Sequence, residues 1–188
     1  MDLSEERELV RQAKKDPDAF AELYDQHYPK IFGYVLRRTA NLEAAQDITS
    51  ETFLKALKKL WQFQWRSISF SCWLYKIAAN EVNQHYRKAE YKKSVSLEEL
   101  QERGFELLSP HDPENELIEA QEKLKQHQDF LEIQGRIVRL PAKYQEVIAL
   151  RFFERKQIKE IAEILGKKEG TIKSLLHRAV ERLREAED

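Results

Sequence analysis

The residues best suited to contact a charged polymer lie near the carboxy-terminal end, between positions 157 and 184. One side of a helix here would carry short polar groups and cations, namely Lys168, Thr171, Lys173, Ser174, His177 and Arg178. Such side chains donate hydrogen bonds to phosphate oxygens and to the edges of DNA bases. The pattern favours DNA binding, although a solvated face of a purely structural helix, with His177 as an ordinary exposed histidine, would look similar.

The apolar residues of the same stretch predict two short helices that would position this polar face. Ile158, Ile161, Ala162 and Leu165 recur at helical spacing, and Gly166 follows them as a residue that readily ends a helix. The second helix would bury Ile172, Leu176, Ala179, Val180 and Leu183. Two short helices around a glycine turn form a helix-turn-helix unit, whose second helix enters the major groove of DNA.

A second candidate site combines aromatic rings with polar side chains. Six of the 19 aromatic residues lie between positions 61 and 75, and we expect most of them, Trp61 and Trp73 included, to pack in a core. The loop 64–69 could receive an unstacked base, because stacking on a ring contributes about 1–3 kcal/mol per base. Basic and amide side chains surround or follow this loop: Arg66, Lys76, Asn80, Asn83, Gln84, Arg87 and Lys88.

The elements that would carry the second site are all predicted helices. The first helix is expected to open near Ser4, and Asp16-Pro17-Asp18 should start the next one, since proline suits a first helical turn. Asn41 marks a break. It precedes an amphipathic helix with a basic flank, whose apolar residues are Ile48, Phe53, Leu54, Leu57 and Leu60. A further helix is predicted from about Phe70 to Lys88, and Pro141 should open another with Val147, Ile148, Leu150 and Phe152 on its apolar face.

The composition agrees with an all-α fold and narrows the class of protein. Charged residues make up 35% of the chain and hydrophobic residues 41%, with only 5 glycines and 5 prolines. No stretch approaches the roughly 18 apolar residues of a membrane span, and no signal peptide is visible. The one cysteine, Cys72, cannot form an internal disulfide or a multi-cysteine zinc site. We therefore expect a cytoplasmic protein without membrane insertion, metal or cofactor.

Charge divides the chain into three parts. Residues 1–90 are nearly neutral, residues 91–133 carry 5 Lys or Arg against 11 Asp or Glu, and residues 134–188 carry 13 against 9. Segment 91–115 is also rich in serine and proline and poor in apolar periodicity. We predict two small helical domains, 1–90 and 134–188, joined by a flexible acidic linker over 91–133.

Four segments, taken in order, resemble a bacterial RNA polymerase sigma factor of the extracytoplasmic-function (ECF) group in the sigma-70 family. Segment 19–25 is similar to the opening of sigma region 2, and segment 45–56 to the helix that docks on core RNA polymerase. Segment 70–80 resembles the part that melts and reads the −10 promoter element. Segment 141–185 resembles region 4, which reads the −35 element. The resemblance covers about residues 10–90 and 134–186.

The resemblance implies a function and a set of contact residues. The protein would bind core RNA polymerase, recognise duplex promoter DNA at −35, and melt and read a single-stranded −10 element. The linker would thread the polymerase channel. Core-binding residues would be Asp47, Ile48, Glu51, Phe53 and Leu54; −10 residues would be Gln64, Trp65, Arg66, Ser67, Lys76, Asn80, Asn83, Gln84, Arg87 and Lys88; −35 residues would be Lys167, Lys168, Glu169, Thr171, Lys173, Ser174, His177 and Arg178. An anti-sigma protein is a further expected partner.

The sequence departs from the family pattern at Gln46, Ser50 and Leu175, and the loop 64–69 lacks a glycine often found there. Other classes of protein remain as alternatives. A conventional helix-turn-helix repressor or activator would explain residues 157–184 but neither the aromatic loop nor the helix at 45–60. A helical scaffold would bind proteins without promoter preference. A small helical enzyme lacks support, because no nucleophile motif, phosphate-binding glycine loop or di-iron motif is present, and no small-molecule substrate is expected.

Overall fold

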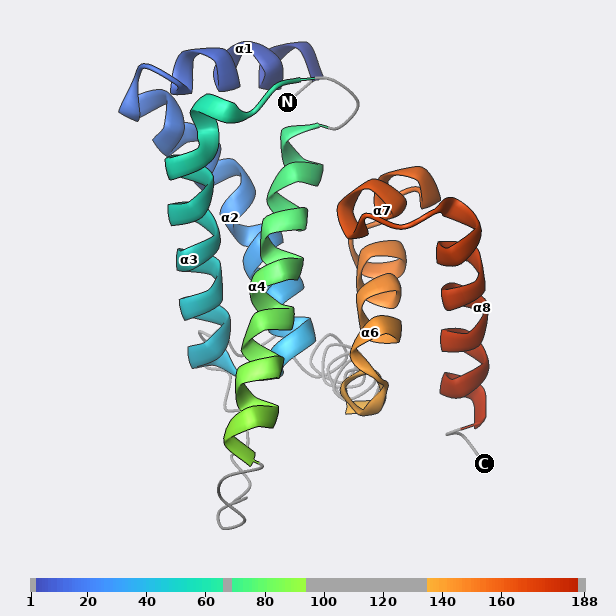
Figure 1. Ribbon diagram of the computed structural model, residues 1–188. Coiled ribbons are helices and arrows are strands. Elements are labelled where there is room, and N and C mark those ends of the chain that lie inside the picture. The colour runs from blue at the N-terminus through green and yellow to red at the C-terminus, as the bar shows by residue number, and fades with distance from the viewer. Residues whose placement is uncertain (1–2, 66–68, 94–134, 186–188) are drawn as a thin grey trace, which may run out of the picture.

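The computed structural model describes residues 3–65, 69–93 and 135–185, and every regular element in these ranges is helical. The chain forms two helical units, one before and one after the predicted linker (Figure 1). The predicted all-α class is confirmed. Residues 94–133 of that linker lie outside the described ranges. No helix among the described residues is long and apolar enough to cross a lipid bilayer.

The first unit contains α1 (Leu3–Ala13), α2 (Pro17–Thr39), α3 (Leu42–Lys59), the short 3-10 helix η1 (Leu60–Gln62) and α4 (Phe70–Lys93). The break points lie where the sequence predicts them. The Asp16 carboxylate accepts a hydrogen bond from the Asp18 amide at 3.0 Å, with Pro17 in the first turn of α2. The Asn41 side chain accepts one from the Ala44 amide at 2.8 Å and caps α3.

The α2, α3 and α4 helices pack side by side, and α1 lies across one end of them (Figure 1). Their shared core includes Leu23, Tyr34, Phe70, Leu74 and Val82. A buried pair fixes α1 in place, because His27 Nε2 of α2 lies 3.2 Å from Glu6 Oε1 of α1. These contacts make the first unit a rigid base for the surfaces of α3 and α4.

The second unit contains a helical turn at residues 135–139, α6 (Ala142–Ile148), η2 (Ala149–Phe153), α7 (Ile158–Leu165) and α8 (Glu169–Glu185). The predicted helical hairpin is confirmed. Gly166 has φ 63 and ends α7, with its amide donating to the Ala162 carbonyl. Ile172 and Ala179 of α8 are buried against α6 and α7. Three further residues of α8 are partly buried and pack against the edge of this core: Leu176, Val180 and Leu183.

Two apolar residues lie differently from the sequence prediction. Phe152 was expected on a buried face but is 57% exposed. The reason is a π-helical turn over residues 149–153, in which the Glu154 amide donates to the Ala149 carbonyl and the wider turn rotates the side chains within it. Trp61 was expected to pack in the core, yet η1 turns it outward and leaves it 70% exposed.

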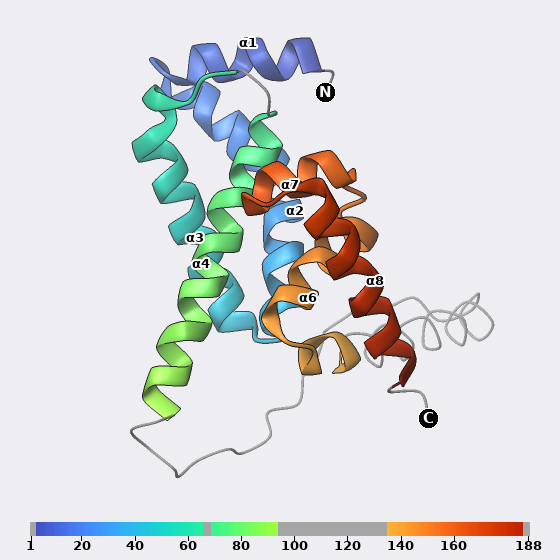
Figure 2. The ribbon, with the colours of Figure 1, turned by 45° about the vertical axis from the view of Figure 1, so that its right-hand side comes forward.

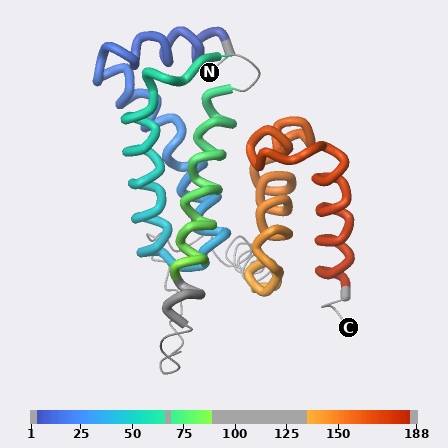
Figure 3. Tube along the Cα trace, viewed as in Figure 1, coloured from blue at the N-terminus to red at the C-terminus, as the bar shows by residue number. Residues whose placement is uncertain are grey.

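The two units lie against each other. The α7 helix contacts α4 and η2 contacts α2, whereas α8 lies on the side of the second unit away from α4 (Figures 2 and 3). The sequence did not predict this arrangement, because the linker length allows both close and distant placements of the two units.

Candidate nucleic-acid interface and docking surface

The α8 helix presents the polar face that the sequence predicts for DNA. All eight predicted −35 residues are exposed: Lys167, Lys168, Glu169, Thr171, Lys173, Ser174, His177 and Arg178. Some of them have partners within the helix. The Ser174 hydroxyl donates to the Gly170 carbonyl at 3.0 Å, and His177 Nδ1 lies 3.2 Å from Glu181 Oε2. The remaining exposed residues are four cations, the Thr171 hydroxyl and the Glu169 carboxylate.

The turn before α8 positions this face. The Lys167 amide donates to the Ala162 carbonyl at 2.9 Å, and the Thr171 amide donates to the Lys168 carbonyl at 2.9 Å. Leu175 is one of the departures from the pattern that the sequence resembles. It is half-buried and packs against the core of the second unit. This position therefore contributes to packing rather than to the exposed face.

The α4 helix carries most of the second predicted site. Five of its residues form an exposed polar face along successive turns: Lys76, Asn80, Gln84, Arg87 and Lys88. Asn83 differs from them, because it is half-buried and its amide donates to the Glu146 carboxylate of the second unit. Five of the predicted −10 residues thus share one exposed side of α4, and a sixth, Asn83, is already bound within the protein.

The aromatic cluster beside α4 lies mostly in the core, as expected. Phe63 and Phe70 are buried, and Trp73 packs on both, with its ring centroid 5.0 Å from that of Phe63. Trp65 is half-buried against the edge of Phe63, and Gln64 is exposed. Arg66 and Ser67 lie outside the described residues, so their predicted contacts remain predictions.

Two polar contacts brace the described ends of this loop, and sequence reasoning missed both. Lys14 Nζ of α1 donates to the Phe63 carbonyl at 2.6 Å. The Ser69 hydroxyl accepts from the Cys72 amide at 3.2 Å and caps α4. A serine three residues before an amide at a helix start is a recognisable capping signal, whereas the Lys14 contact spans 49 residues and has no local signal.

The α3 helix exposes a surface that is partly acidic and partly apolar. Asp47 and Glu51 are exposed, as is Leu54, whereas Ile48 and Phe53 point into the core and anchor the helix. Leu57 of α3 and Trp61 of η1 continue the exposed side at successive turns and extend it with large apolar groups. Leu57 follows Leu54 by three residues within α3, so helical spacing places both on the same side, and this signal could have identified Leu57.

A cross-helix ion pair holds α3 to α4 beneath this surface. Lys55 Nζ lies 2.6 Å from Glu81 Oε2 of α4 and 3.3 Å from Glu51 Oε1. The hydrogen bond to Glu81 raises the pKa of Lys55 above its ordinary value, so the lysine is charged throughout the physiological range. Within the described ranges, no group of three or more His, Cys, Asp or Glu side chains is placed to hold a metal ion.

Comparison with known proteins places these two units in one family. Residues 23–91 match the model of Sigma-70 region 2, and residues 130–183 match that of Sigma-70 region 4. The chain is 32% identical over 179 residues to the ECF RNA polymerase sigma factor SigW of Bacillus subtilis, covering 95% of this chain and 94% of SigW. The chain belongs to the ECF RNA polymerase sigma factors.

Further relatives agree with this assignment. The chain is 33% identical over 177 residues to the ECF sigma factor BldN of Streptomyces coelicolor, covering 94% of this chain but only 63% of the length of BldN. Among solved structures, CnrH in complex with the cytosolic domain of CnrY has a TM-score of 0.67 at 18% identity, with 96% of both chains covered. RpoE of Bartonella quintana in complex with NepR has a TM-score of 0.69 at 22% identity, covering 88% of this chain and 94% of RpoE.

The family gives the two units their names. We call the first unit region 2, although the family match begins within α2 at residue 23, and the second unit region 4. Region 2 carries the candidate docking surface on α3 and the polar face of α4, and region 4 carries the helix-turn-helix face. As an ECF sigma factor, the protein supports promoter-specific transcription initiation with RNA polymerase. It is a transcription factor rather than an enzyme.

Proposed function

We propose that this ECF sigma factor reads the −35 element with α8, reads and melts the −10 element with region 2, and docks on core RNA polymerase through α3. The observation that carries the proposal is the exposed polar face of α8, which is backed by buried Ile172 and Ala179. The cytoplasm, where core polymerase and the chromosome meet, is the proposed location.

Recognition at −35 rests on the helix-turn-helix geometry. The second helix of such a unit places the residues near its N-terminus against base edges, while cations farther along neutralise phosphates. Thr171, Lys173 and Ser174 therefore belong to the base-contacting part of α8, and Arg178 one turn later to the phosphate-contacting part. Binding should weaken as salt concentration rises, because each neutralised phosphate releases a counterion.

Recognition at −10 rests on the polar face of α4 and the loop before it. Lys76 and Arg87 supply cations for the backbone of the displaced strand, and Asn80 and Gln84 supply amide donors and acceptors for bases. Capturing an unpaired base in the loop 64–69 shifts the DNA melting equilibrium toward the open form without any chemical step. Asn83 can join this site once its bond to Glu146 is broken.

Docking on core polymerase rests on the exposed surface of α3. Asp47 and Glu51 would contact basic groups of the polymerase, and Leu54, Leu57 and Trp61 would bury apolar area against it. An exposed cluster of large apolar side chains on a folded protein is typical of a protein-interaction site. Ile48 and Phe53 would support this surface from within the core.

An anti-sigma protein is a further proposed partner. Among the structural relatives, RpoE of Bartonella quintana is bound to the anti-sigma factor NepR, and CnrH is bound to the cytosolic domain of CnrY. The exposed apolar side chains of α3 offer a surface that such a protein could cover.

The proposal is tested by run-off transcription on fragments of the source genome, with bacterial core polymerase and with or without this protein. Mapping the 5′ ends of the transcripts identifies the upstream bases. We expect discrete 5′ ends that require both components and share sequence elements near −35 and −10. The Asp47→Arg variant should abolish them because a positive charge replaces a negative one on the docking surface, whereas Glu8→Gln on α1 should leave them unchanged.

The opposite outcome would favour a conventional DNA-binding regulator. Such a protein would shift duplex fragments in a gel without polymerase and would yield no polymerase-dependent transcript. A third outcome, co-purification with core polymerase without promoter preference, would favour a helical scaffold.

A further inference from the structure

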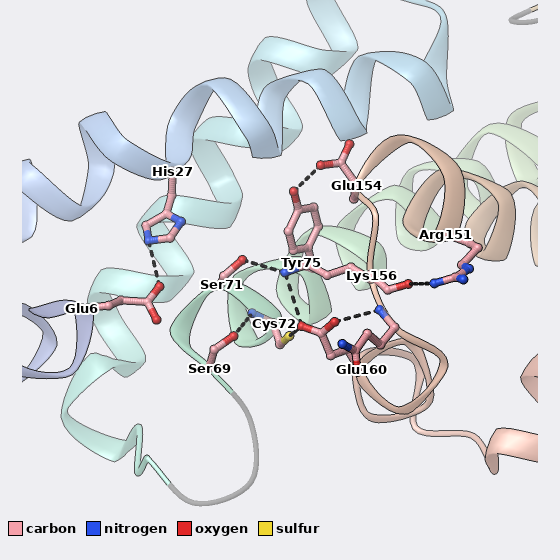
Figure 4. Close-up of polar contacts among 11 residues, drawn as sticks. Glu6, His27, Ser69, Ser71, Cys72, Tyr75, Arg151, Glu154, Lys156 and Glu160 are labelled. Atoms are coloured by element: carbon pink, nitrogen blue, oxygen red, sulfur yellow. Dashed lines mark hydrogen bonds and ion pairs between the residues drawn. The ribbon is translucent and has the colours of Figure 1, made fainter. Parts of the chain in front are cut away.

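Regions 2 and 4 meet through carboxylates of region 4 that contact donors of region 2. Glu154, directly after η2, accepts a hydrogen bond from Arg37 of α2. It also accepts one from the hydroxyl of Tyr75 in α4 (Figure 4). The Glu154 side chain is only 6% exposed. Glu146 of region 4 accepts a hydrogen bond from the side-chain amide of Asn83 in α4. Glu146 Oε1 also lies 3.8 Å from Nη1 of Arg38 in α2.

A third group of contacts surrounds the start of α4. Lys156 Nζ donates to the Ser71 hydroxyl at 3.1 Å and lies 5.0 Å from the centroid of the Tyr75 ring (Figure 4). The Cys72 thiol donates to Glu160 Oε1 at 3.3 Å. Arg37 also stacks on Phe153, with its guanidinium carbon 5.1 Å from the ring centroid. The interface therefore contains several polar contacts beside the buried apolar residues of α4 and α7.

The chemistry of these contacts makes closure specific and reversible. A buried carboxylate needs hydrogen-bond donors, and a hydrogen bond that involves a charge is stronger than one between neutral groups. Glu154 obtains its two side-chain donors from region 2, so separation of the regions removes both. A polar contact between domains resembles a transient protein interface, because both surfaces can be hydrated again on opening.

The closed arrangement does not fit a promoter. Centres of the −35 and −10 elements are about 25 base pairs apart, or about 85 Å at roughly 3.4 Å per pair. A compact chain of this length has a radius of gyration of only about 16 Å. Regions 2 and 4 must therefore separate before α8 and α4 can contact both elements. In the closed form, the side-chain amide of Asn83 donates to Glu146, so this proposed −10 residue is not free to contact DNA.

We propose that this contact is an autoinhibitory latch, in which Glu154, through Arg37 and Tyr75, holds region 4 closed on region 2 in the free chain. The inhibitory effect rests on the proposed function, whereas the closure itself does not. The partner of the region 2 surface is thus region 4 of the same chain, and no second protein is needed to close it.

The single cysteine of the sequence reports opening directly. Cys72 is 2% exposed and lies at the interface against Glu160. Its rate of reaction with a fluorescent maleimide, measured under native conditions, follows the fraction of open chains. We expect slow labelling of the wild type. Tyr75→Phe, which removes only a hydroxyl, and Glu154→Gln, which removes the charge, should each raise the rate roughly tenfold or more, as the loss of a charge-assisted hydrogen bond implies.

Controls separate local opening from unfolding. Glu8→Gln also neutralises a glutamate that binds an arginine, Arg11, but the pair lies exposed on α1. This variant should label at the wild-type rate. Thermal melts followed by circular dichroism show whether each variant keeps its helical fold, and Cys72→Ser confirms that labelling occurs at this thiol. Equal labelling rates in the wild type and both latch variants would overturn the latch.

Transcription tests the inhibitory role separately. Tyr75→Phe and Glu154→Gln should lower the protein concentration that gives half-maximal run-off transcription, several-fold relative to the wild type. Faster labelling without this change would show a contact that does not inhibit and would overturn autoinhibition. If labelling behaves as expected but no variant supports any transcription, the proposed function fails while the closed contact stands.

Discussion

Phe53 and Phe152 have the same side chain, yet the first is 4% exposed and the second 57% exposed. Phe53 lies on the inner side of α3 and packs against Tyr24, with ring centroids 4.7 Å apart. Phe152 lies within the π-helical turn and is exposed to solvent. At the residue scale, position around the helix axis decides whether a side chain supports the core or is available to a partner.

The clearest prediction at this scale concerns Arg178. Because it is exposed on α8 and proposed to contact phosphate, Arg178→Ala should weaken promoter binding of the reconstituted holoenzyme and reduce the slope of log affinity against log salt by about 1. Fluorescence anisotropy with a labelled promoter at several salt concentrations measures both effects. Arg7→Ala, which removes an exposed arginine of α1, is the matched control and should change neither. An unchanged salt dependence for Arg178→Ala would remove this residue from the interface.

Ala40 offers a second prediction, on stability. It ends α2 with φ 47, in the left-handed region that disfavours residues with a Cβ atom. Ala40→Gly should relieve this strain and raise the free energy of unfolding by about 0.5–1 kcal/mol, after the greater flexibility of glycine in the unfolded chain is offset. Urea unfolding followed by circular dichroism measures the change. The opposite substitution, Gly166→Ala at φ 63, should destabilise region 4, and a neutral effect there would contradict the argument.

At the element scale, α3 shows how one helix serves two purposes. Its inner side, with Ile48, Phe53 and Ala56, completes the core of region 2, and its outer side presents carboxylates followed by large apolar groups. An exposed apolar cluster weakens solubility and gains nothing in the free protein, so its presence indicates a partner. The α8 helix has the same division, with polar groups outward because its proposed partner is DNA.

The α3 surface gives a prediction for the docking interface. Leu57→Ser combined with Trp61→Ser should lower affinity for core polymerase at least tenfold, since two exposed apolar groups would no longer be buried on binding. Thermal stability should be unchanged, because both side chains are exposed in the free protein. Biolayer interferometry with immobilised core measures the affinity. Leu42→Ser is the matched control, because Leu42 is equally exposed but begins α3, at the opposite end from Leu57. Equal losses in both variants would argue against a local docking surface.

At the scale of the whole molecule, burial keeps several titratable groups neutral to higher pH than in the unfolded chain. Burial raises the pKa of the Cys72 thiol and of the Tyr75 phenol, and the nearby Glu154 carboxylate raises the latter further. Burial also raises the pKa of Tyr34 and of Tyr86. These groups connect the stability of the closed molecule to alkaline pH.

The sign of that dependence follows from proton binding. In the unfolded chain, cysteine ionises near pH 8.5 and tyrosine near pH 10, whereas the folded protein retains these protons to higher pH. The stabilisation is therefore fully present below about pH 8.5 and decreases as the pH rises above that value. The urea concentration at the unfolding midpoint should fall as the pH is raised from 7 to 10.5. The midpoint of the Tyr75→Phe variant should fall less steeply than that of the wild type. A flat profile for the wild type would contradict these pKa directions.

Local features of region 2 and region 4 could be predicted from the sequence, and the exposed faces only in part. Asp16, Asn41 and Gly166 mark helix ends correctly, because a capping residue acts on amides or carbonyls within a few positions along the chain. The polar face of α8 was also predictable from helical periodicity. Trp61 and Phe152 were misplaced, because a short 3-10 helix and a π-helical turn change the period on which the prediction depends.

The sequence by itself determined the helices, their caps, the helix-turn-helix unit and membership of a recognisable family, since all of these depend on residue spacing within short segments. Tertiary structure decided which helix faces meet. Glu154 binds Arg37 across 117 positions, and Glu146 binds Asn83 across 63. No local pattern encodes such pairs, because they form only when two separately packed units come together and bury their charges. That step closes region 4 on region 2.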